Sequence, residues 1–410
     1  MWGMHLLRHA AIAILLLASA LHAQGKNLLF YGNSFSYFNG GVAQLVRAIA
    51  IEAGFPAPTY QERLFAGQDL HFHATDPGQV AAISNFLPPG QTWDTVIMQG
   101  ISTEATQALG HPVQFVADAI LILGNVRNHS PAAKGVMYQT WARAQGHSYY
   151  PSIFPSPLAM HNEVRTNYRN AIPALEAVYG TGAAVNSAAG DCAALFEFDP
   201  AIYYIDLHHP RKELTVMASM CLFTSIYSRL VCDITPNLSQ PSPLGALLNN
   251  YGLNGADWSR LAGIADCCAA PALRMYPGSG DEFLLETGTQ PGLLTACPHK
   301  TMTIGSLVQV RISSRNGVYN TAPAFLLADL FPTGQPPVPL VFFPEIAVDL
   351  GTMAVLLAAP DLGNPLTLSV QMSFTVPGAS IMVQGLAWAP SAETGNPLFT
   401  TTDGHEFVFQ

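Results

Sequence analysis

The sequence predicts an α/β domain with a parallel sheet, followed by a smaller all-β, sandwich-like domain. From residue 26 to about residue 232, short apolar runs alternate with longer helix-like segments, and this order favours parallel strands with helices on both faces. Beyond about residue 280, short β-type runs recur between glycines and prolines, as in an antiparallel sandwich. Hydrophobic residues make up 49% of the chain and charged residues 11%, a composition typical of packed globular proteins.

The first part supplies its elements in regular order. We expect strands over residues 28–31, 60–65, 95–98, 135–138 and 183–186. We expect helices over residues 42–53, 113–126, 162–179 and 213–230. In the first helix, Leu45, Val46 and Ile49 share one face, and Gly54 ends the periodic pattern.

Composition divides the chain into four predicted segments: a signal peptide over 1–23, the α/β domain over 26–232, a linker with short helices over 233–280, and the β domain over 281–410. Within the last segment, strand-like runs occupy residues 308–312, 325–330, 340–343, 366–374 and 381–388. No His, Asp, Glu or Ser cluster in these runs has catalytic spacing, so we expect a structural or surface-attachment role. Exposed aromatics such as Trp388 would suit carbohydrate binding instead.

The N-terminus predicts export. Arg8 precedes an apolar core over 11–17, which is too short to span a bilayer, and small residues follow up to Ala23. We therefore expect a secreted, periplasmic or cell-surface protein without a transmembrane segment. The net charge is −10 and the 17 Lys and Arg residues form no basic run, which argues against nucleic acid as a partner.

The six cysteines fit an exported protein, and none has the sequence context of a nucleophile. We expect all of them to be structural, although sequence cannot choose their pairing. Cys267 and Cys268 are adjacent, so they should have different partners.

Two short motifs carry the chemistry. Gly32-Asn33-Ser34 follows the first strand, where a sharp turn can hold a hydroxyl at the carboxyl edge of the sheet. Asp206-Leu207-His208-His209-Pro210 places a carboxylate three residues before an imidazole, so both can project from one side of a turn. These are the parts of a serine hydrolase, with Ser34 as nucleophile, His209 as base and Asp206 as its orienting acid. His208 is the competing imidazole.

Donors for an oxyanion are expected on three loops that follow successive strands. The backbone N–H of Ser34 is one, Gly67 can approach a ligand closely, and Gln99 offers a side-chain amide at the same sheet edge.

Together, Gly32-Asn33-Ser34, Gly67, the polar residue after the third strand and Asp206-x-x-His209-Pro210 resemble the four blocks of the SGNH (GDSL-type) hydrolase superfamily. The closest-looking branch has Gly-Asn-Ser-Phe-Ser after its first strand and occurs in exported bacterial proteins. The resemblance implies a three-layer, flavodoxin-like α/β/α domain that hydrolyses esters, often acetyl groups on carbohydrates or acyl groups on lipids. It also implies the triad Ser34, Asp206 and His209, with Gly67 in the oxyanion hole.

The sequence departs from the superfamily pattern in two places. Asn33 stands where an aspartate is usual, and Gln99-Gly100-Ile101-Ser102 replaces the usual Gly-x-Asn-Asp block. Either Gln99 or Ser102 could supply the third oxyanion donor, and we favour Gln99. Losing one such donor typically lowers the rate about 10²- to 10³-fold.

Two alternatives remain open. On a strand, the alternating spacing of Asp69, His71 and His73 would put all three on one face, and with His208 or His209 they could form a zinc hydrolase site. We favour a different interpretation, in which His71 and His73 begin the segment after the second strand, one facing solvent and one packing near the cleft. Alternatively, the altered third block could mark a catalytically degenerate domain that binds glycan or serves as a surface protein.

The favoured interpretation is a secreted serine esterase that needs no cofactor or metal. It would act on a small-molecule or glycan ester with an acetyl or short acyl group. Trp141, His147, Tyr149 and Tyr150 follow the fourth strand and are expected to line the cleft. The sequence does not indicate the acyl-chain length or the oligomeric state.

Overall fold

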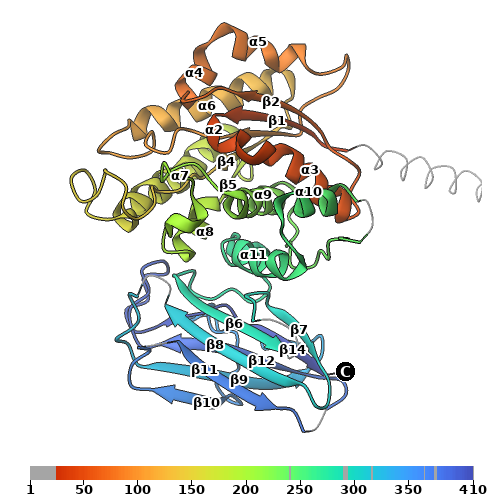
Figure 1. Cartoon of the computed structure of the whole chain (residues 1–410), viewed down its shortest axis with the longest axis vertical. Coiled ribbons are helices and arrows are strands. Elements are labelled where there is room, and N and C mark those ends of the chain that lie inside the picture. The colour runs from red at the N-terminus through yellow and green to blue at the C-terminus, as the bar shows by residue number, and fades with distance from the viewer. Residues whose placement is uncertain are drawn as a thin grey trace, which may run out of the picture.

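The computed structural model describes residues 25–239, 242–289, 294–314, 317–363, 365–373 and 376–409. The predicted signal peptide lies outside the described residues. An α/β part forms one end of the molecule, and a β part forms the other (Figure 1). None of the described helices is long and apolar enough to cross a membrane.

The α/β part is built on a five-stranded parallel sheet with the order β2-β1-β3-β4-β5. Its strands are β1 (Asn27–Gly32), β2 (Thr59–Leu64), β3 (Thr95–Met98), β4 (Lys134–Tyr138) and β5 (Ala184–Ser187). All five coincide closely with the predicted strands. The parallel pairing confirms the predicted α/β fold class.

Helices cover both faces of this sheet (Figure 1). The core on one face includes side chains of α3 (Val42–Glu52), α8 (Ala189–Leu195), α9 (Lys212–Tyr227), α10 (Pro243–Tyr251) and α11 (Gly255–Cys267). The core on the other face includes side chains of α4 (Leu70–Thr75), α5 (Pro77–Asn85), α6 (Pro112–His129) and α7 (Pro157–Tyr179). Successive β1 residues alternate between the two cores, since Leu28 and Phe30 lie in one and Leu29 and Tyr31 in the other.

The segment predicted as a linker contains α10 and α11, whose apolar side chains join the core formed by α3 and α9. Trp258 of α11 is buried and donates its indole N–H to the carbonyl of Ile234. Cys232, which follows α9, forms a disulfide with Cys297 of the β part. The other four cysteines, Cys267 and Cys268 among them, are free thiols in the structure.

The β part contains two sheets, with the orders β10-β9-β12-β14-β7 and β11-β8-β6, and a short strand β13 paired with β12. Apolar side chains from both sheets share one core, which confirms the smaller all-β domain. The strands are β6 (Phe283–Thr289), β7 (His299–Met302), β8 (Leu307–Ser314), β9 (Ala324–Pro332), β10 (Ala354–Ala359), β11 (Leu366–Gln371), β12 (Ala379–Ala387), β13 (Thr400–Thr401) and β14 (His405–Phe409).

The predicted strand at 340–343 is wrong. This segment forms only an isolated bridge between Leu340 and Phe343, and Val341 and Phe342 are almost fully exposed. Prolines at positions 336, 337, 339 and 344 remove backbone donors around it, so a regular ladder cannot form. Phe374, at the end of another predicted strand, lies outside the described residues.

Candidate active site

Ser34 is the first residue of helix α2 (Ser34–Tyr37), directly after β1 ends at Gly32. Asn33 between them caps the helix, because its Oδ1 accepts from the Phe35 N–H at 3.2 Å. The Asn33 Nδ2 donates to the carbonyl of Gln68 at 2.9 Å, which ties the Gly67 loop to the serine turn. The turn is therefore fixed largely by one neutral side chain.

The turn also has no room for a side chain at position 32. A Cβ on Gly32 would lie 2.7 Å from both the Gln99 Oε1 and the Ser36 Oγ. Glycine at this position lets β1 end in close contact with the loop that follows β3.

Asp206 organises the second loop, which precedes α9. Its Oδ1 accepts from the backbone N–H groups of His208 and His209, both at 3.0 Å. Leu207, between Asp206 and His208, has a φ of +61°, a left-handed conformation that lets the chain fold back over the Asp206 carboxylate. Tyr203 and Pro210 close the loop through an isolated antiparallel bridge.

The two loops, far apart in sequence, meet at Ser34 and His209. The His209 Nε2 lies 2.8 Å from the Ser34 Oγ, and the His209 Nδ1 lies 2.7 Å from the Asp206 Oδ2. The structure therefore joins Ser34, His209 and Asp206 in one chain of hydrogen bonds. His208 does not take part in it, because its Nδ1 faces the main-chain oxygen of Asp206 at 3.2 Å.

Aromatic contacts fix the imidazole ring of His209. The Phe38 ring stacks on it at a centroid distance of 4.0 Å with an interplanar angle of 10°, and Phe35 meets it edge-on at 5.7 Å. Asn39 anchors the Phe38 segment to the histidine loop, since its Nδ2 donates to the carbonyl of Pro210 at 2.9 Å. Neither Phe38 nor Asn39 was expected from sequence, because only the folded contact shows their position.

The electrostatics of the site favour an ionised Asp206. Partial burial works against ionisation, but the hydrogen bonds from His209 and from the backbone outweigh it and lower the pKa of Asp206 to about 2. Burial, together with the positive charge of Arg143, lowers the pKa of His208 below its ordinary value. The neutral form of His208, which lies beside His209, is therefore favoured.

Gly67 is exposed and borders open space. It has a φ of +68°, and a Cβ built on it would meet no atom within 4 Å. Its loop is held beside the serine turn by the Asn33–Gln68 hydrogen bond. The Ser34 and Gly67 backbone N–H groups are thus both on loops that meet at the nucleophile turn.

Gln99 and Ser102 are placed differently from the expectation. Both are fully buried, so neither side chain is open to a substrate. The Gln99 Oε1 accepts from the Asn33 N–H at 3.0 Å and from the Ser36 Oγ at 2.8 Å, and its Nε2 donates to the carbonyl of Gly100. The Ser102 hydroxyl has no hydrogen-bond partner within the described part of the chain. Gln99 therefore supports the serine turn from inside the protein, through Asn33 and Ser36.

Asp69, His71 and His73 do not share a strand face, because Asp69 caps helix α4 and both histidines lie in it. The interpretation favoured for the two histidines agrees with the structure, since His71 faces solvent and His73 is packed inside. Asp69 caps this helix at the Phe72 N–H, and the exposed His71 lies 3.2 Å from Asp118. The buried His73 lies 3.0 Å from the carbonyl oxygen of Gly32, and burial lowers its pKa to about 4. The three side chains therefore point in different directions, as i, i+2 spacing on a helix requires.

Among the described residues, only Asp206, His208 and His209 bring three possible metal-ligating atoms within 4.8 Å of one another. Both ring nitrogens of His209 already have partners in Ser34 and Asp206. This set fits the hydrogen-bonded chain better than a metal centre.

Glu104 is a further buried carboxyl near these loops, and no sequence motif pointed to it. It accepts from the backbone N–H groups of Leu70 and Ile101, so it bridges the loops that follow β2 and β3. Burial raises the pKa of Glu104 to about 8.

The residues after β4 line the site only in part. Trp141 was expected in the cleft but is fully buried, and its indole N–H donates to the carbonyl of His208 at 3.1 Å. It therefore supports the histidine loop from inside. His147 and Tyr149 keep part of their surface, and Tyr150 donates its hydroxyl to the carbonyl of Arg143 at 3.0 Å.

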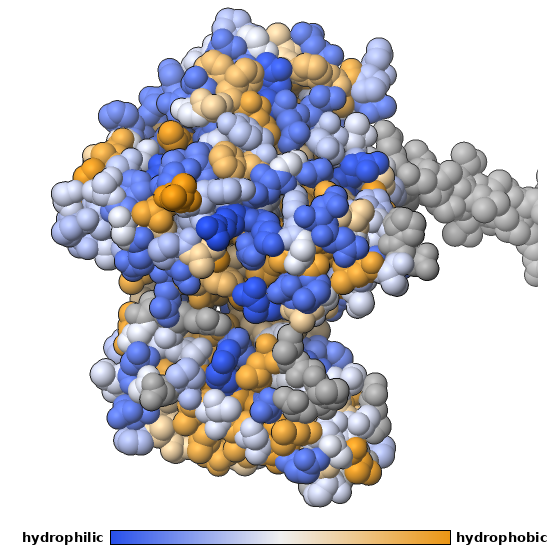
Figure 2. Space-filling model, viewed as in Figure 1, coloured by the Kyte–Doolittle hydropathy of each residue, from blue (hydrophilic) through white to orange (hydrophobic). Residues whose placement is uncertain are grey.

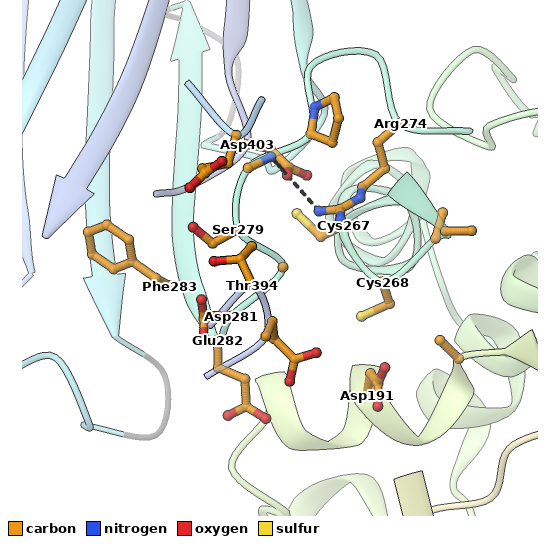
Figure 3. Close-up of a pocket in the computed structure, with 18 of the residues that line it drawn as sticks. Asp191, Cys267, Cys268, Arg274, Ser279, Asp281, Glu282, Phe283, Thr394 and Asp403 are labelled. Atoms are coloured by element: carbon orange, nitrogen blue, oxygen red, sulfur yellow. Dashed lines mark hydrogen bonds and ion pairs between the residues drawn. The ribbon is translucent and has the colours of Figure 1, made fainter. Parts of the chain in front are cut away.

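A cavity of about 580 Å³ lies between the α/β part and the β part, and it is not lined by Ser34, Asp206 or His209. Figure 3 shows its charged and thiol side chains, among them Asp191, Cys268 and Glu282, converging from both parts. The face seen in Figure 2 narrows at the same level, with strongly hydrophilic residues gathered above the narrowing. The cavity is thus separate from the candidate triad.

No family model and no curated protein matches the sequence. Solved structures do match, and the three described below cover about half of this chain. A protein of Slackia heliotrinireducens provisionally assigned as an SGNH hydrolase is 20% identical, with a TM-score of 0.37 over 50% of this chain and 100% of its own. A DUF4886 family protein from Bacteroides uniformis is 15% identical, with a TM-score of 0.43 over 56% and 93%. A carbohydrate esterase of family 3 from Talaromyces cellulolyticus is 12% identical, with a TM-score of 0.37 over 51% and 99%.

The SGNH superfamily named among these structures is the one that the sequence motifs resemble. Its exported branch remains a prediction.

Proposed function

We propose that this chain is a serine esterase of the SGNH type that hydrolyses an ester through an acyl intermediate on Ser34. The observation that carries the proposal is the chain of hydrogen bonds from the Ser34 Oγ through His209 to Asp206, with distances of 2.8 and 2.7 Å. A hydroxyl is a weak nucleophile until a base takes its proton, and this geometry supplies the base and its orienting acid.

In the first half-reaction, the His209 Nε2 takes the proton of the Ser34 hydroxyl while its oxygen attacks the ester carbonyl. The tetrahedral intermediate then collapses, and the protonated His209 gives its proton to the departing alcohol. In the second half-reaction, His209 takes a proton from water, which attacks the acyl-serine and releases the acid. Asp206 stabilises the imidazolium in both halves through its ionised carboxylate.

The oxyanion would be stabilised by the backbone N–H groups of Ser34 and Gly67. Because Gln99 and Ser102 are fully buried, we assign neither side chain as a donor to the substrate. Gln99 would act by holding the Asn33 N–H and the Ser36 hydroxyl in place. The hole would then rest on two main-chain donors.

The substrate proposed is an acetyl or short acyl ester, borne by a small molecule or a carbohydrate. Matching structures include a carbohydrate esterase of family 3 from Talaromyces cellulolyticus and a carbohydrate esterase family 2 enzyme from Corynascus thermopiles. Export by the N-terminal segment fits a polysaccharide substrate outside the cell. The β part would serve as a structural or attachment domain.

One observation favours a second candidate, a glycan-binding protein without turnover. The absence of a side-chain oxyanion donor at Gln99 or Ser102 would suit a domain whose catalysis has decayed.

A fluorophosphonate probe separates the two candidates. An active protein should form a stoichiometric serine adduct, and S34A should form none. Hydrolysis of p-nitrophenyl acetate should fall on the order of 10⁴- to 10⁶-fold in S34A and H209A. A folded wild-type protein that forms no adduct would support the binding role and reject the esterase.

A further inference from the structure

Arg143 is a buried cation beside the candidate active site. It belongs to the segment between β4 and α7 that packs on the histidine loop, where the Ala144 N–H donates to the carbonyl of Leu207 at 2.9 Å. Only 7% of Arg143 is exposed. Burial lowers the pKa of Arg143 below its ordinary value, while the nearby tyrosines oppose this effect.

The guanidinium of Arg143 has no carboxylate partner. Its Nε and Nη1 are buried without a hydrogen-bond partner in the described part of the chain. By contrast, the partly buried Arg165 and Arg274 each pair with acids, Arg165 with Glu393 at 2.9 Å and Arg274 with Asp403 at 2.6 Å. A buried charge is normally paired, so an arginine left unpaired next to a reactive site calls for a partner.

Aromatic rings supply only part of what Arg143 lacks. Its Cζ lies 5.7 Å from the centroids of both the Phe35 and the Tyr149 rings. Cation–π contacts stabilise a charge, but they give the guanidinium Nε and Nη1 no hydrogen-bond acceptor, and the side-chain hydrogen bond of Arg143 with Tyr149 is to a neutral group. Two donor atoms of the planar fork, Nε and Nη1, therefore still lack an acceptor among the described residues.

The guanidinium of Arg143 lies close to the candidate triad. Phe35, which the guanidinium touches, directly follows Ser34 and lies 5.7 Å from His209 and 6.2 Å from His208 by ring centroids. Arg143 is thus one aromatic ring away from the triad. The nearby carboxylate, Asp206, already accepts from His209 and from two backbone N–H groups.

We propose that Arg143 binds an anionic group of the ester substrate, a carboxylate or a sulfo group next to the reacting bond. This inference rests on the proposed function, since it assigns a substrate class to the same site. A carboxylate accepts two parallel N–H bonds from arginine, and such charge-assisted bonds are about twice as strong as neutral ones. Arg143 would then select acidic esters, such as those on a uronic acid or a sulfated sugar, over neutral ones.

The test compares three matched aryl acetates: 4-acetoxybenzoate, 4-acetoxybenzenesulfonate and methyl 4-acetoxybenzoate. The last has an electron-withdrawing group of similar size but no charge. The ratio of kcat/KM for each anionic ester to that for the neutral ester should fall about 10- to 100-fold in R143M. R143K should keep part of the preference. R47M, which removes an exposed positive charge elsewhere, should keep the wild-type ratio.

The carboxylate and sulfonate arms decide which anion is bound. An R143M ratio equal to that of the wild type for both anions would overturn the proposal and leave Arg143 a structural cation. If circular dichroism shows that R143M does not fold, the test uses the preference of the wild type and of R143K for anionic over neutral esters. A wild-type protein that hydrolyses the neutral ester as readily as both anionic ones would reject it.

A binding measurement keeps the inference separate from the esterase itself. In S34A, which cannot turn over substrate, 4-hydroxybenzoate should bind about 10-fold or more tightly than to S34A/R143M in calorimetric titration. Binding without any ester hydrolysis by the wild type would reject the esterase and retain the anion site. Ester hydrolysis by the wild type, together with equal binding of 4-hydroxybenzoate to S34A and S34A/R143M, would retain the esterase and reject the anion site.

Discussion

The imidazole of His209 and the ring of Phe38 lie parallel, with centroids 4.0 Å apart and planes inclined by 10°. Phe38 sits four residues after the candidate nucleophile, so the segment that carries the serine also supports its base. The ring limits rotation of His209 about its side-chain bonds and keeps the Nε2 directed at Ser34.

The first prediction concerns this stacking. F38A should lower kcat about 10-fold while changing KM little, because the base is less well positioned but the substrate contacts remain. F38Y keeps the ring and should stay close to the wild type. Steady-state kinetics on p-nitrophenyl acetate measures both. Equal losses in F38A and F38Y would contradict a role for ring stacking.

Asp206 gives a second prediction, since its loss should be less damaging than that of the other triad members. D206A should retain on the order of 10- to 100-fold more activity than S34A, because the imidazole survives but is poorly held. Turnover of the three single variants under one set of conditions tests this. A silent D206A would require a different orienting group.

The third prediction concerns how the stability of the folded protein changes at acid pH. The pKa of Asp206 is about 2 in the folded protein, below its ordinary value of 3.8. The ionised carboxylate therefore stabilises the fold above pH 3.8, and this contribution disappears as the pH falls toward 2. The difference in melting temperature between wild type and D206N should narrow over this interval. A difference that is constant down to pH 2 would contradict the lowered pKa.

Gln99 is the subject of the fourth prediction. Q99L should leave the buried Asn33 N–H without its acceptor and destabilise the protein by about 1–3 kcal/mol, measured by chemical denaturation. Its kcat should also fall, because the serine turn loses its support. An oxyanion donor would behave differently: Q99L would lose kcat at unchanged stability.

The last prediction concerns the contact between the two parts of the chain. Glu393 of the β part accepts from Arg165 at 2.9 Å and from Arg169 at 2.5 Å, both on α7. E393Q should lower stability by about 1–3 kcal/mol, less at high salt, while leaving ester hydrolysis intact. E197Q, at an exposed glutamate, is the control. Equal melting temperatures for E393Q and wild type would show that the network contributes nothing.

Much of the α/β part could be predicted because its signals are local. The inner strands β1, β3 and β4 are short, largely apolar runs, and the residues on β1 alternate between two cores as the sheet requires. The motifs around Ser34 and His209 were also visible, since the spacing of Asp206 and His209 already places both on one turn. Their meeting depends on parallel strands that end at a shared edge.

Other features depend on contacts that no local pattern encodes. The alternation of Asp69, His71 and His73 left a shared strand face as an alternative, but Asp69 caps a helix by accepting from the Phe72 N–H. The parallel pairing of β14 with β7 joins residues about a hundred positions apart. Trp141 looked like a cleft residue, yet its indole is used to hold the carbonyl of His208 inside the protein.

The Asn33 side chain has a consequence for residue choice at this position. Its Nδ2 donates a proton to the Gln68 carbonyl, whereas an aspartate there would present a negative oxygen to another acceptor and push the two segments apart. Amide chemistry at 33 and the path of the glycine segment are therefore coupled, and a carboxylate could replace the amide only if the backbone at 68 found another donor. A change of Asn33 to a carboxylate would therefore require a matching change in the loop that contains Gly67 and Gln68.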